Sequence, residues 1–238
     1  MPPTLILIRH AQAIHNIDSN LHDPDLSDLG RQQAAELREH LKAHLPPNLK
    51  VQFIVVSPMR RAIQTCLIAL DWLIDSGVPI VPDARWQELY PKPCDTGTPA
   101  AQLAAEFPQI DFSSLDPVYP DKTSPAGARY AYDKQAILAR GQSALADLYA
   151  RPGEGGAIVV VSHSGFMRTA VAGRWFANAD FRVFDFEERG AGDEKEEEGM
   201  EGRRRLYRLV EWELTRGKGG MGRSSEEVVE FGEGLPGL

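Results

Sequence analysis

The stretch TLILIRHAQAIHN, residues 4–16, joins an apolar run to a cluster of basic and polar side chains. Residues 4–8 (TLILI) are short, apolar and β-prone, which predicts a buried strand of a largely parallel sheet. Arg9 and His10 follow this run directly. Because ligands bind at the carboxyl ends of strands in open α/β sheets, we expect both side chains at a ligand site.

Two further apolar runs are also followed by basic or polar residues. Residues 51–56 (VQFIVV) lead into Ser57 and Arg61, and residues 157–161 (AIVVV) lead into His163. The carboxyl ends of parallel strands meet at one edge of a sheet, so we expect these side chains beside the first pair. Two guanidinium groups and two imidazoles suit a dianionic phosphoryl group, because arginine forks bind phosphate oxygens and stay charged.

The remaining pattern predicts helices and strands that alternate along the chain. Ser27 is expected to cap the first helix. Residues 90–130, rich in Pro, Asp, Thr and Gly, are interpreted as an excursion over the active face. Further helices are predicted over residues 60–74, 99–106, 132–149 and 165–176, and further strands over residues 78–81, 181–186 and 205–214.

One catalytic domain is expected over residues 1–215, because this is a routine size for a single α/β unit. Residues 188–204 within it are charged and contain glycine, which predicts a solvated hairpin insertion rather than a docking segment. Residues 216–238 are Gly-rich and weakly apolar, and we interpret them as a flexible C-terminal tail.

The composition argues against several classes of protein. The chain has 238 residues, a formal net charge of −8 and a pI of about 5.3, which disfavour a binder of nucleic acid or membrane surfaces. No apolar run reaches the length of a membrane span, and no targeting segment is visible. Cys66 and Cys94 stand in no zinc-ligand or disulfide spacing, so we expect a cytoplasmic protein with two free thiols.

Four segments in order resemble the motifs of the histidine phosphatase superfamily, the phosphoglycerate mutase-like proteins. They are RHAQAIHN (9–16), LSDLGRQQA (26–34), SPMRRAIQT (57–65) and VVSHSGFMR (160–168). The resemblance extends over residues 4–215. It implies a three-layer α/β/α fold with a mostly parallel six-stranded sheet and one antiparallel edge strand. It implies neither a metal nor another cofactor.

The resemblance also implies roles for individual residues. His10 is similar to the nucleophilic histidine of the family, while Arg9, Arg61 and His163 match the residues that hold the phosphoryl group. Asn16 matches an asparagine that contacts phosphate in many members. The chemistry requires a neutral imidazole at the nucleophile, and a backbone carbonyl near its other nitrogen would fix the tautomer.

The proton donor is less settled by the sequence. Glu88, in RWQELY, resembles the family's donor to the leaving oxygen, and Asp95, in PCDTG, is its competitor unless it caps the helix near residue 99. Gln12 stands where glutamate is common, and Ser164 replaces a glycine after the second histidine. Together with Ser57 and Asp95, these two residues are candidates for substrate contacts.

The leading hypothesis is therefore a metal-independent phosphatase that acts on a small phosphorylated metabolite through a phosphohistidine. A phosphoglycerate mutase-type phosphotransferase is the alternative, although no basic cluster occurs in the excursion. A hydrolase or binding protein of the same fold with a non-phosphate ligand is a further alternative. The substrate and the oligomeric state cannot be read from the sequence.

Overall fold

The central feature of the molecule is one mixed sheet. The computed structural model describes residues 2–14, 20–151, 156–187 and 207–237, and the strands in these ranges have the order β3-β2-β4-β1-β5-β6. β5 is antiparallel to both of its neighbours, whereas β1, β2, β3 and β4 pair in parallel. The strands are β1 (Thr4–Arg9), β2 (Val51–Val56), β3 (Ile80–Pro82), β4 (Ala157–Ser162), β5 (Phe181–Phe186) and β6 (Leu209–Glu211).

This topology confirms a mostly parallel six-stranded sheet. The antiparallel strand β5 lies one place in from the edge rather than at it, because β6 pairs along its outer side. Only the short run 209–211 of the predicted 205–214 strand forms β6 within the described residues. The third predicted strand, 78–81, is shifted to 80–82.

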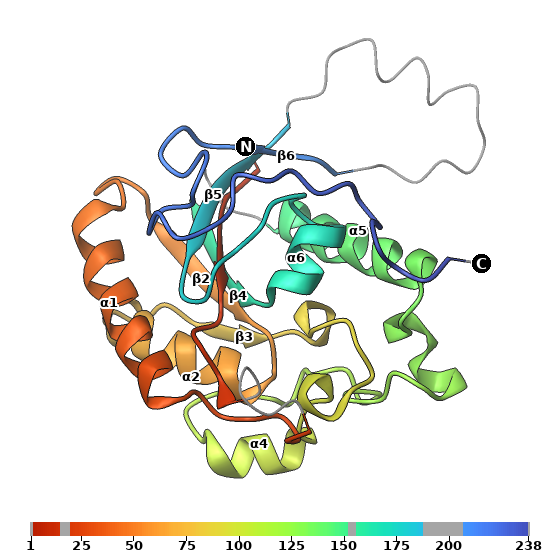
Figure 1. Cartoon of the computed structure of the whole chain (residues 1–238). Helices are drawn as coiled ribbons and strands as arrows, with labels where there is room; N and C mark the ends of the chain where they lie inside the picture. The colour runs from red at the N-terminus through yellow and green to blue at the C-terminus, as the bar shows by residue number, and fades with distance from the viewer. Residues whose placement is uncertain (1, 15–19, 152–155, 188–206, 238) are drawn as a thin grey trace.

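The sheet is covered by helices on both faces, which gives the predicted three layers (Figure 1). Alternate residues of β1 separate the two cores: Ile6 and Ile8 pack with one helical layer, and Leu5 and Leu7 with the other. All four side chains are fully buried. The first layer contains α1 (Asp28–His44), α2 (Arg60–Ala69) and α3 (Asp71–Asp75), and the second contains α5 (Lys134–Ala150) and α6 (Ser164–Ala170).

Helix boundaries follow local backbone chemistry. Ser27 caps α1 as predicted, since its hydroxyl accepts the N–H of Gly30. The predicted helix over residues 60–74 is divided at Leu70, which leaves the helical region with a φ of −120°. The predicted helix over 165–176 ends at Ala170, because Gly173 adopts a left-handed φ of 62° and its carbonyl pairs with Val229.

The connection from β3 to α5, which includes the excursion of residues 90–130, is tied to the carboxyl ends of the parallel strands. Tyr119 donates its hydroxyl proton to the carbonyl of Pro58 at 2.6 Å, and Asp23 accepts the N–H groups of Arg60 and Thr98. These contacts attach the excursion to the start of α2, as an element over the active face requires. The connection contains η2 (Ala84–Trp86), η3 (Pro93–Asp95), α4 (Ala100–Glu106) and η4 (Pro125–Tyr130), of which α4 confirms the predicted short helix.

The C-terminal segment, residues 216–237, for which the sequence predicts a flexible tail, contacts β5 and the residue before it. We call these residues the C-terminal strap. Arg182, fully buried on β5, donates to the carbonyls of Gly217 and Ser225, both at 2.9 Å. Asp180 accepts the hydroxyl of Ser224 at 2.6 Å. The weakly apolar residues are held here through backbone carbonyls, and the flexibility of the segment stays a prediction. The predicted insertion 188–204 lies outside the described residues.

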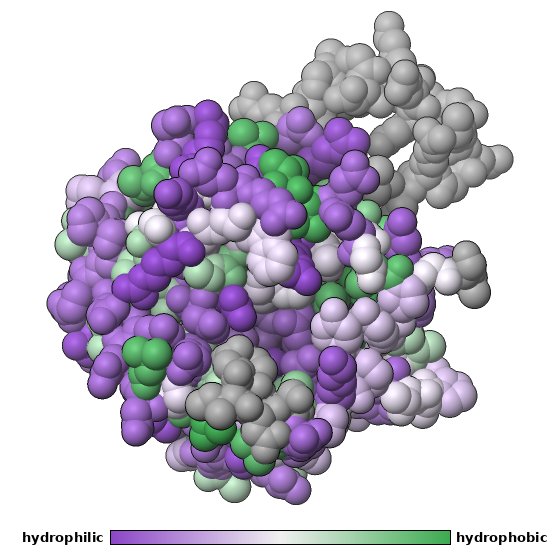
Figure 2. Space-filling view, in the orientation of Figure 1, coloured by the Kyte–Doolittle hydropathy of each residue, from purple (hydrophilic) through white to green (hydrophobic). Residues whose placement is uncertain are grey.

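The surface is largely polar on the face shown in Figure 2, where hydrophobic residues form small separate groups. No helix of the described residues is long and apolar enough to cross a membrane. Both observations agree with the sequence, in which no apolar run approaches the length of a span.

Candidate active site

His10 lies at the carboxyl end of β1 in a defined tautomer. Its Nδ1 is 2.7 Å from the carbonyl oxygen of Ala11, which can only accept a hydrogen bond, so Nδ1 carries the proton. Nε2 then presents its lone pair, and Arg61 donates its Nε proton to it at 3.2 Å. The side chain is 2% exposed. The geometry therefore describes a neutral imidazole in a fixed orientation, as the nucleophilic role requires.

The second imidazole lies beside the first. The ring centroids of His10 and His163 are 5.0 Å apart, and the ring planes are inclined by 58°. His163, at the end of β4, is fully buried, and its Nε2 is 2.7 Å from the hydroxyl oxygen of Ser57 at the end of β2. The parallel sheet thus unites three chain segments that are far apart in sequence, as predicted.

Arg61 is held rigidly on the first turn of α2. Its side chain is fully buried, and its Nη1 and Nη2 donate to the carbonyl of Cys94 at 2.6 Å and to Oδ1 of Asp95 at 2.9 Å. With its Nε directed at His10, all three nitrogens of the guanidinium are engaged. This fork is oriented before any ligand binds, which lowers the ordering cost of phosphate recognition.

Arg9 supplies a second, partly buried cation at the end of β1. Its Nη1 donates to the carbonyl of Phe176 at 2.8 Å, while its Nε has no hydrogen-bond partner among the described residues. Burial lowers the pKa of Arg9 to about 10, and the negative charge of Glu88 opposes this shift. The guanidinium therefore remains charged near neutral pH.

The carboxylate of Glu88 lies at the start of α6. Its Oε1 accepts the backbone N–H of Leu89 at 3.0 Å and of Phe166 at 2.9 Å, and its Oε2 accepts that of Gly165 at 3.2 Å. A Cβ atom on Gly165 would lie 2.4 Å from Oε1, so the absence of a side chain there makes the approach possible. Three backbone donors fix this carboxylate in one orientation.

Asp95, the competing carboxylate, is also buried. Burial and the charge of Glu88 raise the pKa of Asp95, and the ion pair with Arg61 opposes the rise. A raised pKa suits a group that must carry a proton near neutrality. However, the contact with Arg61 also gives Asp95 a structural task, because it anchors one arm of the guanidinium.

Comparison with known proteins identifies the family. A sequence model of the histidine phosphatase superfamily (branch 1) matches residues 5–187. The chain belongs to this superfamily. A protein from Schizosaccharomyces pombe named "Probable phosphatase" is similar to it, with 33% identity over 167 residues that cover 67% of this chain and 73% of the relative.

Solved structures of histidine phosphatases share the fold. A mycobacterial glucosyl-3-phosphoglycerate phosphatase in complex with VO3 aligns with a TM-score of 0.50 and 23% identity, over 88% of this chain and 97% of that one. A phosphoglycerate mutase from Bacillus anthracis aligns with a TM-score of 0.51 and 18% identity, over 76% and 87% of the two chains. These neighbours agree with the topology of the sheet.

Four predicted substrate contacts of this histidine phosphatase need comment. Gln12 is directed to the start of α1, where its Oε1 accepts the hydroxyl proton of Ser27 at 2.7 Å. Ser164 begins α6, and its buried hydroxyl has no hydrogen-bond partner among the described residues. Asn16 lies outside the described residues. The contact of Ser57 with His163 gives that serine an orienting task, and the substrate-binding roles of all four residues remain predictions.

Two further residues support the histidine phosphatase site and were missed from the sequence. Thr65 accepts the N–H of Ala11 at 3.0 Å and donates to the carbonyl of Arg61 at 2.7 Å, so it ties the loop after β1 to α2. Its place four residues after the arginine, in the same motif, was a usable signal. Asn178 donates to the carbonyl of His10 at 3.1 Å from a segment without any motif.

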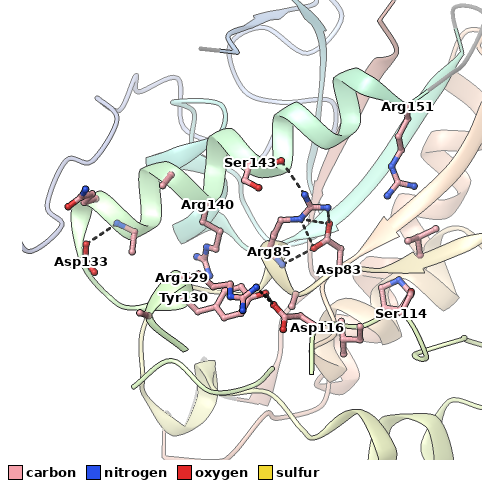
Figure 3. A pocket seen from close by; sticks show the side chains of 18 residues that line it. Asp83, Arg85, Ser114, Asp116, Arg129, Tyr130, Asp133, Arg140, Ser143 and Arg151 are labelled. Carbon is pink, nitrogen blue, oxygen red and sulfur yellow. Dashed lines mark hydrogen bonds and ion pairs between the residues drawn. The ribbon is translucent and has the colours of Figure 1, made fainter. Parts of the chain in front are cut away.

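A cavity of about 860 Å³ adjoins α5, η2 and η4 (Figure 3). Arg85 and Arg129 in its wall pair with aspartates. Arg140 is 4% exposed, and its nitrogens have no hydrogen-bond partner among the described residues. Burial lowers its pKa to about 10. Its guanidinium stacks 4.2 Å from the ring centre of Phe166, whose N–H holds Glu88. Arg140 therefore connects the cavity wall with the catalytic edge.

Proposed function

We propose that this chain is a phosphatase that hydrolyses a small phosphomonoester through a phosphohistidine on His10. The observation that carries the proposal is a neutral imidazole whose Nε2 accepts a hydrogen bond from the buried guanidinium of Arg61 and whose ring lies 5.0 Å from a second imidazole, that of His163. Membership of the histidine phosphatase superfamily and the phosphatase named in Schizosaccharomyces pombe support it. No step of the mechanism requires a metal ion.

In the first half-reaction, Nε2 of His10 attacks the phosphorus atom. The bond to the leaving oxygen breaks, its electron pair remains on that oxygen, and the carboxyl proton of Glu88 is transferred to it. Arg9, Arg61 and His163 bind the equatorial oxygens, where negative charge is spread in the transition state. The Nδ1–H bond to Ala11 stabilises the positive charge that develops on the ring.

In the second half-reaction, water attacks the phosphorus atom of the phosphohistidine. Glu88, now a carboxylate, accepts a proton from the water, and the N–P bond breaks with its electron pair returning to Nε2 of His10. The products are an alcohol and inorganic phosphate, and the protein is restored to its starting protonation state. The same carboxylate therefore serves as acid and then as base.

The contacts of the basic residues in the excursion favour hydrolysis over a mutase reaction. A mutase must retain a doubly phosphorylated intermediate, so it needs a second anion site. Residues 90–131 contain three basic side chains. Lys122 donates to backbone carbonyls, Arg129 pairs with Asp116, and Lys92 lies 5.0 Å from the ring centre of Tyr90. None of these contacts forms a second anion site beside the cradle, by which we mean Arg9, His10, Arg61 and His163, in the described part of the chain.

The decisive test is trapping of the intermediate. Wild-type protein in excess chelator is mixed with p-nitrophenyl phosphate, quenched in alkali within milliseconds, and its intact mass is measured. We expect one added phosphoryl group that His10→Asn abolishes together with turnover, a loss of at least about a thousandfold. His44→Asn, an exposed histidine of α1, is the matched control. Full turnover in His10→Asn, or release of phosphate only with an added metal, would overturn the proposal.

The proton donor is assigned by varying the leaving group. p-Nitrophenolate departs without protonation, whereas the alkoxide of glycerol 2-phosphate requires it. If Glu88 is the donor, Glu88→Gln lowers kcat/KM for glycerol 2-phosphate by about a hundredfold more than for p-nitrophenyl phosphate. Asp95→Asn then lowers both values to a similar extent through Arg61. The opposite pattern would assign the proton to Asp95.

A cytoplasmic location is part of the same proposal. Cys66 and Cys94 are both buried and free in the structure. Burial raises the pKa of Cys66 to about 12, so its thiol is unreactive in the folded protein. Two unpaired thiols agree with a reducing compartment, and subcellular fractionation is the direct measurement.

A further inference from the structure

Lys122 is a buried ammonium that the family motifs do not include. The residue is 5% exposed, and its Nζ donates to three main-chain carbonyls. The acceptors are the oxygens of Glu88 at 2.7 Å, Tyr90 at 3.1 Å and Asp95 at a still shorter distance. An ammonium has three protons, so each carbonyl receives one, and the segment from Glu88 to Asp95 wraps around a single cation.

The two ends of this segment are the two carboxylates of the site. Asp95 is bonded to Arg61, which is bonded to His10, so the nucleophile is linked to the Asp95 end by short contacts. Lys122 links that end to Glu88. It thereby completes a path of hydrogen bonds and covalent bonds from the attacking nitrogen to the backbone of Glu88, the residue proposed to protonate the leaving oxygen.

Burial of a lysine ammonium destabilises the fold unless each of its N–H groups has a hydrogen-bond acceptor. Removing a lysine ammonium from water carries a penalty of several kcal/mol, which good acceptor geometry must offset. Lys122 is surrounded by charges from several elements: Arg61 on α2, Arg140 on α5, and the carboxylates of Glu88 and Asp95. A buried cation in this place orders the segment that carries both carboxylates.

We propose that Lys122 is a positioning residue, which clamps residues 88–95 so that the Glu88 carboxylate faces the leaving oxygen. This inference rests on the proposed function of Glu88. The clamp acts on the backbone and does not touch the phosphoryl group. Its loss should therefore impair proton transfer to the leaving group more than binding of phosphate, because displacement of a catalytic group by about 1 Å can cost about a hundredfold in rate.

The test replaces the ammonium with a side chain of similar length that has no donor. For Lys122→Met, we expect kcat/KM for glycerol 2-phosphate to fall about a hundredfold, and for p-nitrophenyl phosphate about tenfold or less. Inhibition by vanadate, which occupies the cradle, should change less than about threefold. Lys92→Met, an exposed lysine of the same segment, is the matched control and should leave all three quantities unchanged.

A second variant keeps the inference testable if Lys122→Met does not fold. The amide of Lys122→Gln retains two of the three donors, so the selective loss against the alkyl phosphate should fall between those of wild type and Met. Equal losses with both substrates, weakened vanadate inhibition, or no loss in a folded variant would overturn the clamp. A wild-type protein that hydrolyses neither substrate would instead contradict the proposed function.

Discussion

The Nε of Arg61 lies 3.2 Å from the Nε2 of His10, so the cation donates to the atom that is proposed to attack phosphorus. Because Nε2 accepts a hydrogen bond from Arg61, it carries no proton of its own, and the repulsion of a second positive charge favours the neutral imidazole. The same guanidinium is held at its other two nitrogens by residues 94 and 95. The nucleophile is thus oriented by the excursion as well as by its own strand.

Arg61→Lys should separate charge from geometry. Lysine keeps the cation but cannot contact residues 10, 94 and 95 at once, so we expect kcat/KM for p-nitrophenyl phosphate to fall about a hundredfold. Arg60→Lys is the control on the neighbouring residue, whose Nη2 pairs with Glu106 outside the cradle. Steady-state kinetics of both variants test this prediction. Equal losses of kcat/KM in Arg61→Lys and Arg60→Lys would contradict the role of the Arg61 guanidinium.

Gly165→Ala should displace the carboxylate of Glu88 while residue 88 itself is unchanged. The new Cβ would lie 2.4 Å from Oε1, so the carboxylate must move and lose its backbone donors. We expect hydrolysis of glycerol 2-phosphate to fall about a hundredfold, with a smaller loss for the aryl phosphate. Gly237→Ala, where a Cβ meets open space, is the matched control. An undiminished rate in Gly165→Ala would contradict the placement of Glu88.

Arg140→Met should stabilise the fold. The guanidinium is buried beside Phe166, and its pKa is lowered because the loss of hydration is not offset by its surroundings. We expect the free energy of unfolding to rise by about 1–3 kcal/mol, measured by urea denaturation. Arg85→Met, which removes a paired arginine from the same cavity wall, should lower it by about 1 kcal/mol. A loss of stability in Arg140→Met would show that its charge is compensated.

Lys122 should make stability depend on pH in a defined window. Burial, reinforced by the charge of Arg140, lowers the pKa of Lys122 from 10.5 to about 7. Between these values the unfolded chain binds more protons than the folded chain, so this group makes the free energy of unfolding rise with pH. Below about pH 7 both states are protonated, and Lys122 is then the ammonium that supplies a donor to each of the three carbonyls; above about 10.5 neither state is protonated.

The measurement compares wild type with Lys122→Met in urea at several values of pH. The difference in free energy of unfolding, wild type minus variant, should increase as the pH rises from about 7 to about 9. Lys92→Met provides the baseline for a lysine exposed to solvent. Parallel curves for wild type and Lys122→Met would mean that the lysine has an ordinary pKa in the fold.

The catalytic edge could be predicted from sequence because it depends on strand ends. Apolar runs before His10, Ser57 and His163 are local signals, and a parallel sheet must bring their carboxyl ends together. Helix starts were equally local, as the cap of α1 at Ser27 shows. Glu88 was found through the resemblance alone, and its three backbone donors come from residues that carry no polar signal.

Contacts made through backbone atoms could not be predicted. The carbonyls that bind Lys122 belong to residues more than twenty positions away, and any residue type could supply them. The contacts of the C-terminal strap could not be predicted for the same reason, because its composition does not indicate that Arg182 donates hydrogen bonds to its carbonyls. Gln12 was placed near substrate by its motif, but the hydroxyl of Ser27 engages its amide oxygen.

The dependence of Arg182 on the strap has a consequence for biosynthesis. This buried guanidinium on β5 draws acceptors from Trp175, Glu211, Gly217 and Ser225. While the ribosome is still adding the residues after β6, the nascent chain holds a central cation whose last partners have yet to be translated. The domain therefore reaches its native packing only after Ser225 has been translated, and a premature stop codon before Gly217 would leave the buried guanidinium of Arg182 without two of its acceptors.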